Sequence, residues 1–119
     1  MAAPNLKSPT TINGKTARYA VTASIAAALS NASSSGKVLK INSIFCANVD
    51  GSSSADISIT IYDGATDIYI AKEISVPIKA TQILSGKDTY FYLEEGDSIR
   101  AVASAASDLE LVIGYEDIS

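Results

Sequence analysis

Residues 37–62, KVLKINSIFCANVDGSSSADISITIY, form two alternating runs on either side of an Asp50-Gly51 turn. Successive side chains of a strand point to opposite faces, so strict alternation predicts one buried side and one solvent-facing side. The residues on one parity of the first run are Leu39, Ile41, Phe45, Ala47 and Val49. Those of the second run are Ile57, Ile59 and Ile61, which alternate with Ser58, Thr60 and Tyr62. Asp-Gly favours a tight turn, and the serines after it indicate a longer loop. The stretch predicts two paired strands over a hydrophobic core.

Further strand-like runs follow at the spacing of about 8–12 residues that is typical of sandwiches and barrels. They lie within residues 67–74, 76–84, 90–93, 99–103 and 109–116. Ile68 and Ile70 fall on one face of the first of these, with Tyr69 on the other. Pro77 has no amide donor, so its strand is expected at a sheet edge or is expected to start late. Residues 90–93, YFYL, are apolar on both parities, which indicates either burial on both sides or an aromatic contact surface.

Residues 17–30, ARYAVTASIAAALS, fit two patterns. The positions of Val21, Ile25 and Leu29 suit a helix, and the alanines favour helix by propensity. The alternation from Tyr19 to Leu29 suits a strand equally well. Because the rest of the chain has a β pattern and no helix C-cap precedes the next run, we predict a strand here.

The predicted fold is therefore all-β, an antiparallel sandwich of about eight strands. Two sheets packed face to face bury many strands that are apolar on one side. Eight strands favour a jelly-roll. An immunoglobulin-like sandwich is the alternative, but the chain has one cysteine and no tryptophan, so it lacks the paired cysteines and the tryptophan of true immunoglobulin domains.

Composition restricts the functional classes. The 119 residues suffice for one domain, and 47% hydrophobic residues exclude a disordered chain. The net charge of −4, with scattered basic residues, argues against nucleic acid and against an acidic membrane surface. No apolar run approaches the ~20 residues needed to span a bilayer, and the N-terminus lacks the apolar core of a signal peptide. The single cysteine, Cys46, lies within a strand-like run and is expected to be a buried thiol.

Catalytic chemistry has few candidates. The chain has no histidine, which removes the commonest general base and a common metal ligand. The acidic groups are Glu94, Glu95 and Asp97 in a turn, and Glu116 and Asp117 near the C-terminus, where solvated charge is the expected role. A loose calcium-like spacing is formed by Asp50, Ser52, Ser54 and Asp56. Since Ser-rich hairpin loops are common without metal, we predict no catalytic residue, no cofactor and no metal.

Partner contacts have four candidates. Pro4 and Pro9 predict that residues 1–15 form an extended arm before a β-sandwich domain of residues 16–119. Leu6 and Ile12 are the sizeable apolar residues of this arm. Two interpretations of the arm stay open: a frayed terminus, or a segment that orders on a neighbouring subunit. Tyr62 and Tyr69 are expected to face outward if the isoleucines beside them point inward, and exposed tyrosines suit protein or sugar contacts.

The succession KVLKINSIFCANVDG, ADISITIYDG, ISVP and YLEEGDSIRAVASAASDLELVIGYEDI resembles small virion structural proteins of tailed bacteriophages, especially those of marine cyanobacterial hosts. The similarity runs from about Tyr19 to Ile118. Its most recognisable part is the turn Leu93-Glu-Glu-Gly-Asp97, followed by an alternating strand and the closing Tyr115-Glu-Asp-Ile118.

This resemblance implies a non-enzymatic part of a phage particle, made in the host cytoplasm and located on the virion. The single small acidic domain with an arm favours a capsid decoration, or cement, protein on the capsid surface. Its implied partner is the major capsid protein of the same phage, and its implied assembly is a homo-oligomer, a trimer by analogy. The alternative is a tail, neck or fibre component that binds a host or a glycan.

Overall fold

The computed structural model describes residues 3–119, and these form nine strands and one short 3₁₀ helix. The elements are β1 (Ile12–Ala20), β2 (Ala26–Ser30), β3 (Val38–Asn48), β4 (Ala55–Tyr62), β5 (Asp67–Val76), β6 (Thr81–Ser85), η1 (Lys87–Thr89), β7 (Phe91–Leu93), β8 (Ser98–Ala103) and β9 (Leu109–Ile118). The expected strand at 17–30 is confirmed in type, but it is two strands separated by a short connection. Within the described residues no helix is long and apolar enough to cross a membrane.

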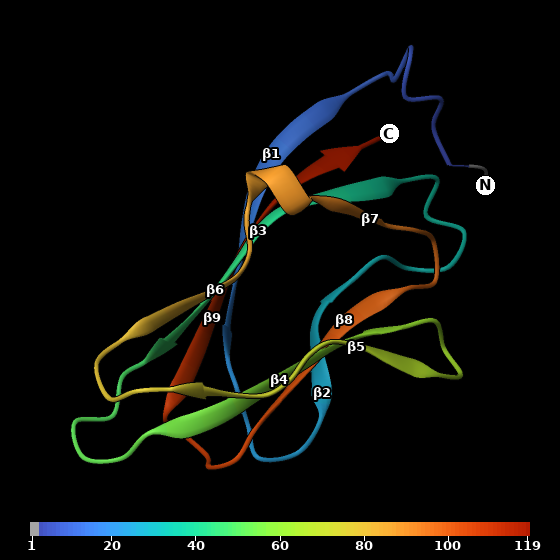
Figure 1. The fold of residues 1–119 in the computed structure, drawn as a ribbon. Coiled ribbons are helices and arrows are strands. Elements are labelled where there is room, and N and C mark those ends of the chain that lie inside the picture. The colour runs from blue at the N-terminus through green and yellow to red at the C-terminus, as the bar shows by residue number, and fades with distance from the viewer. Residues whose placement is uncertain (1–2) are drawn as a thin grey trace.

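The strands form two antiparallel sheets, which confirms the predicted β-sandwich (Figure 1). One sheet has the order β1-β9-β3-β6, and β7 also pairs with β3; the other has the order β2-β8-β4-β5. Strands β6 and β7 follow one another along the same edge of β3, joined by η1. Since the first strand pairs with the last and the chain crosses repeatedly between the sheets, this order is compatible with a jelly-roll.

The core lies between the sheets and is built from the inward parity of each strand. Ile57 and Ile59 of β4 are fully buried, as the alternation of that run predicts. The other large apolar side chains with less than 2% exposure are Ile41, Ile44, Leu93, Ile99, Leu109, Leu111, Ile113, Val21 and Val76. Because both sheets contribute, the described part of the chain has one continuous core.

The parity prediction for the first run is wrong beyond Ile41. The register against β9 passes from Ile41 opposite Tyr115 to Ser43 opposite Gly114, so Asn42 is an extra residue, a β-bulge. One extra residue reverses which parity faces the core. Leu39 and Ile41 are buried as expected, but the residues buried after the bulge are Ile44 and Cys46, whereas Phe45 and Val49 are exposed.

Gly114 accommodates this bulge. A Cβ atom added at Gly114 would lie 2.9 Å from the side-chain oxygen of Ser43, closer than real Cβ contacts come. The bulge therefore depends on the glycine that β9 places opposite it.

Strand β5 gives a second correction. Ile70 packs against the core, but Ile68, expected on the same face, is 67% exposed. The register between β4 and β5 shifts twice near Ile59, and Glu73 has a positive φ of 53°, so β5 does not alternate regularly. The expectation for Pro77 is confirmed, because β5 ends at Val76 and both β5 and β6 are edge strands.

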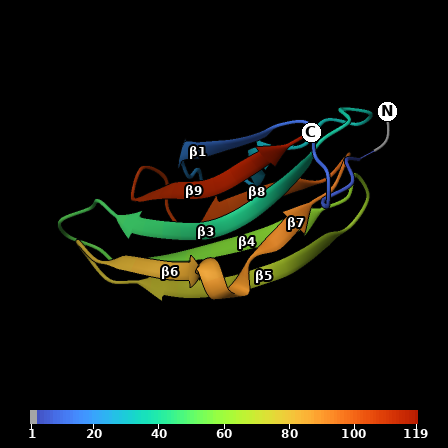
Figure 2. The ribbon, with the colours of Figure 1, turned by 90° about the horizontal axis from the view of Figure 1, so that it is seen from above.

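The start of β1 and the end of β9 lie side by side (Figures 1 and 2). Strand β1 pairs along β9 from Ile12 opposite Ile118 to Ala20 opposite Glu110. Just before β1, the amides of Thr10 and Thr11 donate to the carbonyl oxygen of Ser119 at 2.7 and 3.0 Å. The segment outside the sheets therefore ends before Ile12, earlier than the predicted arm of residues 1–15, whose residues 1 and 2 lie outside the described range. The division into arm and domain stays a prediction.

Candidate functional site

An exposed apolar row crosses the outer face of the five-stranded sheet. Phe45 of β3 lies opposite Val112 of β9 and opposite Ile83 of β6. Directly opposed side chains on one sheet face have Cβ atoms roughly 4.5–5.5 Å apart, so the three are neighbours. Their exposed fractions are 37% for Phe45, 39% for Val112 and 62% for Ile83. We call these three residues the apolar row. Arg18 of β1, opposite Val112, continues it to the edge of the sheet.

A second row of smaller side chains lies beside the apolar row on the same face. Ala47 is two residues from Phe45 on β3, and it lies opposite both Glu110 of β9 and Thr81 of β6. Ala20 of β1 lies opposite Glu110. We call Ala20, Glu110, Ala47 and Thr81 the second row. The face therefore carries bulky apolar side chains next to a strip of mostly small ones.

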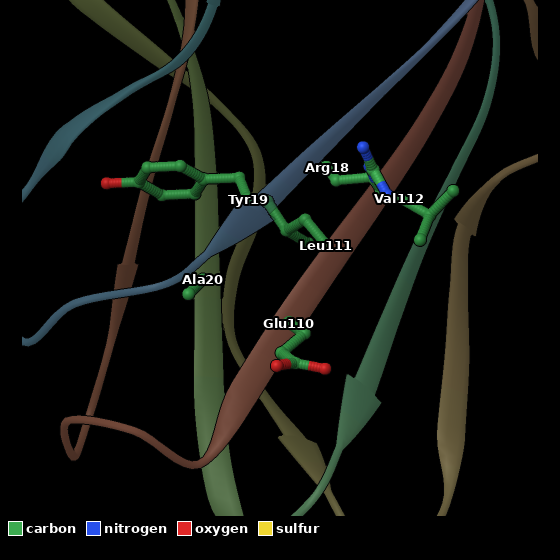
Figure 3. A pocket seen from close by; sticks show the side chains of 6 residues that line it. All are labelled: Arg18, Tyr19, Ala20, Glu110, Leu111 and Val112. Carbon is green, nitrogen blue, oxygen red and sulfur yellow. The ribbon is translucent and has the colours of Figure 1, made fainter.

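A pocket of about 290 Å³ lies where the two rows reach β1 (Figure 3). Its lining residues are Arg18, Tyr19, Ala20, Glu110, Leu111 and Val112. In Figure 3 the ring of Tyr19 points away from Val112, as the alternation of side chains requires. The pocket is smaller than most small-molecule sites, which span roughly 300–1,000 Å³. It is best described as the hollow edge of the sheet face.

An aromatic cluster lies on the same sheet toward the other end of β3. Tyr90 and Tyr92 stand edge to face with ring centroids 5.9 Å apart, and the Lys40 ammonium lies 4.3 Å from the Tyr90 centroid. Both tyrosines are exposed, while Leu93 is fully buried. Of the two expectations for residues 90–93, this geometry matches an aromatic contact surface and excludes burial on both sides.

The two arm candidates lie near the paired chain ends. Leu6 is 48% exposed, and it belongs to a short turn in which the Ser8 amide donates to the carbonyl of Asn5 at 3.0 Å. Ile12, 55% exposed, begins β1 opposite Ile118. Both apolar side chains are therefore accessible to a partner. Their role in binding one stays a prediction.

The two tyrosine candidates lie on the other sheet. Tyr69 of β5 is opposite Thr60, on the outward parity of β4 that also includes Tyr62. Tyr69 is half exposed, whereas Tyr62 is partly covered by the guanidinium of Arg100, whose Cζ lies 4.2 Å from the ring centroid. Asp67 joins this network: the Thr60 hydroxyl donates to it at 2.6 Å, and the Arg100 Nε lies 3.4 Å from the same oxygen. The four candidates thus lie in three places, with Leu6 in the turn before β1, Ile12 on β1 and the tyrosines on the other sheet, and they form no common site.

The acidic groups of the turns serve local structure. The Gly36 amide donates to a carboxylate oxygen of Glu95 at 3.1 Å. The Asp50 carboxylate accepts from the amide and the hydroxyl of Ser52, and Asp56 lies in the β4–β5 ladder. Within residues 3–119, no three or more His, Cys, Asp or Glu side chains converge as metal ligands.

Asp117 is the exception to the expectation of solvated charge. It is 5% exposed, and one carboxylate oxygen lies 3.0 Å from the Lys15 ammonium and 3.2 Å from that of Lys37. Burial by itself raises the pKa of Asp117, but hydrogen bonds and the charges of both lysines outweigh it and lower the pKa. The hydrogen bond to Asp117 also raises the pKa of Lys15. This triad joins β1, β9 and the chain preceding β3.

The triad predicts a pH dependence of stability. Because the folded-state pKa of Asp117 is lowered, its contribution is complete above the ordinary value of 3.8 and is lost as the pH falls through the folded-state pKa. Asp117→Asn is therefore expected to lower the free energy of unfolding at neutral pH, by an amount that shrinks in acid below that value. Urea unfolding of both proteins across a pH series measures the difference. A difference that acidification leaves unchanged would contradict the ion-pair account.

Cys46 is fully buried on the inward side of β3, as the sequence predicts. Desolvation raises the pKa of its thiol to about 11, so the thiol stays protonated at neutral pH. It is a packing residue.

Comparison with known proteins supports the fold. No family model matches the sequence, and no curated protein is significantly similar to it. A solved structure described by the words "Bacillus endospore appendages form a novel family of disulfide-linked pili" superposes with a TM-score of 0.53. It is 13% identical and covers 92% of this chain and 87% of that one. At this identity the likeness establishes a shared sandwich fold alone.

Two further structures are more distant. Both are of a pentameric capsid protein isolated from metagenomic phage sequences, 18% identical, with TM-scores of 0.41 and 0.42. Each match covers 85% of this chain, and this chain spans 59% of the length of one of those proteins and 60% of the other. Likenesses at this level carry no argument for fold or function.

Proposed function

We propose that this protein is a non-enzymatic structural component of a tailed-phage particle, which decorates and stabilises the capsid shell. The observation that supports it is the placement of apolar surface. The core is closed between the two sheets, and yet Leu6 and Ile12 remain about half exposed next to the paired chain ends. Apolar side chains that the fold does not need are available to bury against another protein.

The resemblance to virion structural proteins supplies the partner, the major capsid protein of the same phage. The net charge of −4 favours a protein partner over nucleic acid. In this proposal the protein is a homo-oligomer on the capsid surface.

The mechanism is mass action combined with burial. A subunit that bridges neighbouring capsomers binds the assembled shell better than its separate parts, so it shifts the equilibrium toward assembly. Leu6 in the segment before β1 and Ile12 at the start of β1 add contact area. Some of the gain is offset by the entropy lost when the segment becomes ordered on the shell.

Removal of the N-terminal segment tests this proposal. Deletion of residues 1–9 keeps β1 and the bonds of Thr10 and Thr11 to Ser119, so the fold is expected to remain intact. Attachment to capsids purified without the protein is expected to weaken by about tenfold or more, since burial of one leucine side chain contributes about 1.5–3 kcal/mol. Leu6→Ser should reproduce much of this loss.

Ile78→Ser is the matched control. Ile78, 45% exposed, lies in the connection between β5 and β6, so the variant removes apolar surface elsewhere. It should attach as the wild type does. Full attachment of the truncated protein would reject the role of the segment.

The second candidate function is host or glycan binding by a tail, neck or fibre component. It is favoured by Tyr69, half exposed with the Lys72 ammonium 5.0 Å from its ring centroid. Immunogold labelling of virions separates the two candidates, since label on the head supports decoration. Label on the tail would reject decoration, and Tyr69→Ala would then be expected to weaken binding.

A further inference from the structure

We infer that the outer face of the five-stranded sheet docks against the same face of a second copy of this chain. The contact is made by the apolar row of Phe45, Val112 and Ile83 and by the second row beside it. This inference does not depend on the proposed function, because it concerns the pairing of the protein with itself.

The outer face of the five-stranded sheet is apolar and has the area of a protein interface. The three members of the apolar row lie across adjacent strands and are all exposed, so their apolar surface is contiguous. Strands lie about 4.8 Å apart and rise about 3.4 Å per residue, so four strands along the length of β3 present on the order of 700 Å². Stable interfaces of standard size bury roughly 600–1,000 Å² on each partner. The face is therefore large enough for a specific dimer.

The face is complementary to itself in shape, because large side chains lie beside small ones. Ala47 lies next to Phe45 on the same face of β3, and Ala20 lies next to Arg18 on β1. Consider a two-fold axis that lies between the two rows and runs perpendicular to the strands. This axis places the apolar row of each copy over the second row of the other. Phe45 of each copy then lies over Ala47 of the other, a large side chain over a small one. Such alternation lets two sheet faces interdigitate.

The face also carries two opposite charges, those of Arg18 and Glu110. Arg18 lies in line with the apolar row, and Glu110 lies on the neighbouring strand in the second row. Both are exposed, and neither takes part in an ion pair within residues 3–119. The same two-fold axis brings Arg18 of each copy beside Glu110 of the other. The face is thus complementary to itself in charge, as a two-fold interface requires.

The opposite sheet provides the contrast. On its outward side, Asp67 accepts from the Thr60 hydroxyl and lies 3.4 Å from Arg100, whose guanidinium covers Tyr62. The charges of Arg100 and Asp67 pair within one copy. The outer face of the five-stranded sheet instead combines an exposed apolar row with two charges, Arg18 and Glu110, that have no ion pair in the described part of the chain.

Sedimentation equilibrium of the full chain tests the inference. The wild type is expected to form a dimer. Phe45→Ser is expected to raise the dissociation constant of this dimer by at least about tenfold. Arg18→Glu and Glu110→Arg are each expected to raise the dissociation constant by about tenfold. Because both residues are exposed, these variants should fold normally. The double variant swaps the two charges, and its dissociation constant should return to within about threefold of the wild-type value.

Tyr69→Ser, on the opposite sheet, is the matched control and should leave the dissociation constant unchanged. A wild type that is monomeric at all concentrations, or a trimer, would overturn the two-fold contact. So would a Phe45→Ser variant that associates normally, or a double charge variant that does not recover. Failure of the protein to attach to capsids would reject the proposed function and leave this dimer untouched.

Discussion

Asn48→Ala is expected to lower the free energy of unfolding by about 3 kcal/mol, because it leaves three buried or partly buried backbone groups without partners. Asn48 is 3% exposed at the end of β3. Its amide nitrogen donates to the carbonyl oxygens of Ser53 at 3.0 Å and Val76 at 2.9 Å, and its side-chain oxygen accepts from the Asp50 amide at 2.9 Å. One side chain thus joins the β3–β4 loop to the end of β5.

Asn42 supplies the matched control for this prediction. It is the extra residue of the bulge on the same strand, and its side chain donates to Glu116 at the partly exposed surface, at 2.9 Å. Asn42→Ala is expected to cost less than about 1 kcal/mol. Urea unfolding of both variants checks the pair. Equal losses would show that the buried hydrogen bonds of Asn48 are not what stabilises this end of the sandwich.

Ile59→Ala is expected to lower the free energy of unfolding by about 3–4 kcal/mol. Ile59 is fully buried on β4, which lies between β8 and β5, so truncation leaves a cavity that both layers line. Ile68→Ala is the same chemical change on the neighbouring strand at a side chain that is 67% exposed, and it is expected to cost about 0.5 kcal/mol.

The comparison of these two isoleucines also tests the irregularity of β5. A large loss for Ile68→Ala in urea unfolding would mean that β5 alternates regularly and that Ile68 faces the core. A small loss would agree with the double register shift between β4 and β5.

Much of the sandwich follows from local patterns in the sequence. The second run of the central pair is predicted well, since Ile57 and Ile59 are buried and no bulge interrupts their pairing with β8. The edge position of β6 and its late start at Thr81 follow from Pro77, which cannot donate to a ladder. In these cases one residue or one period decides the structure, so the sequence alone is sufficient.

The candidate site could not be predicted, because it depends on one residue of register. Asn42 has nothing in its own side chain that marks a bulge, and the space that Ser43 occupies is provided by Gly114, far along the chain. The shift turns Phe45 from the core to the surface and brings Val112 and Ile83 beside it. Only the pairing of distant strands shows this face.

Asp117 was mispredicted for a similar reason. Next to Glu116 at the end of the chain, it has the sequence context of a solvated acid. Pairing of β9 with both β1 and β3 places it among buried neighbours, where Lys15 and Lys37 reach it from other parts of the chain. Partners that are distant in sequence are not visible from local charge patterns.

The bulge at Asn42 gives β3 a core face and an outward face, with Ile44 and Phe45 on opposite sides. Urea unfolding of Ile44→Ala and Phe45→Ser, at concentrations where the protein is monomeric, tests it most directly. We predict a loss of about 3 kcal/mol for Ile44→Ala and less than about 1 kcal/mol for Phe45→Ser. A loss for Phe45→Ser as large as that for Ile44→Ala would contradict the account, because it would place Phe45 in the core.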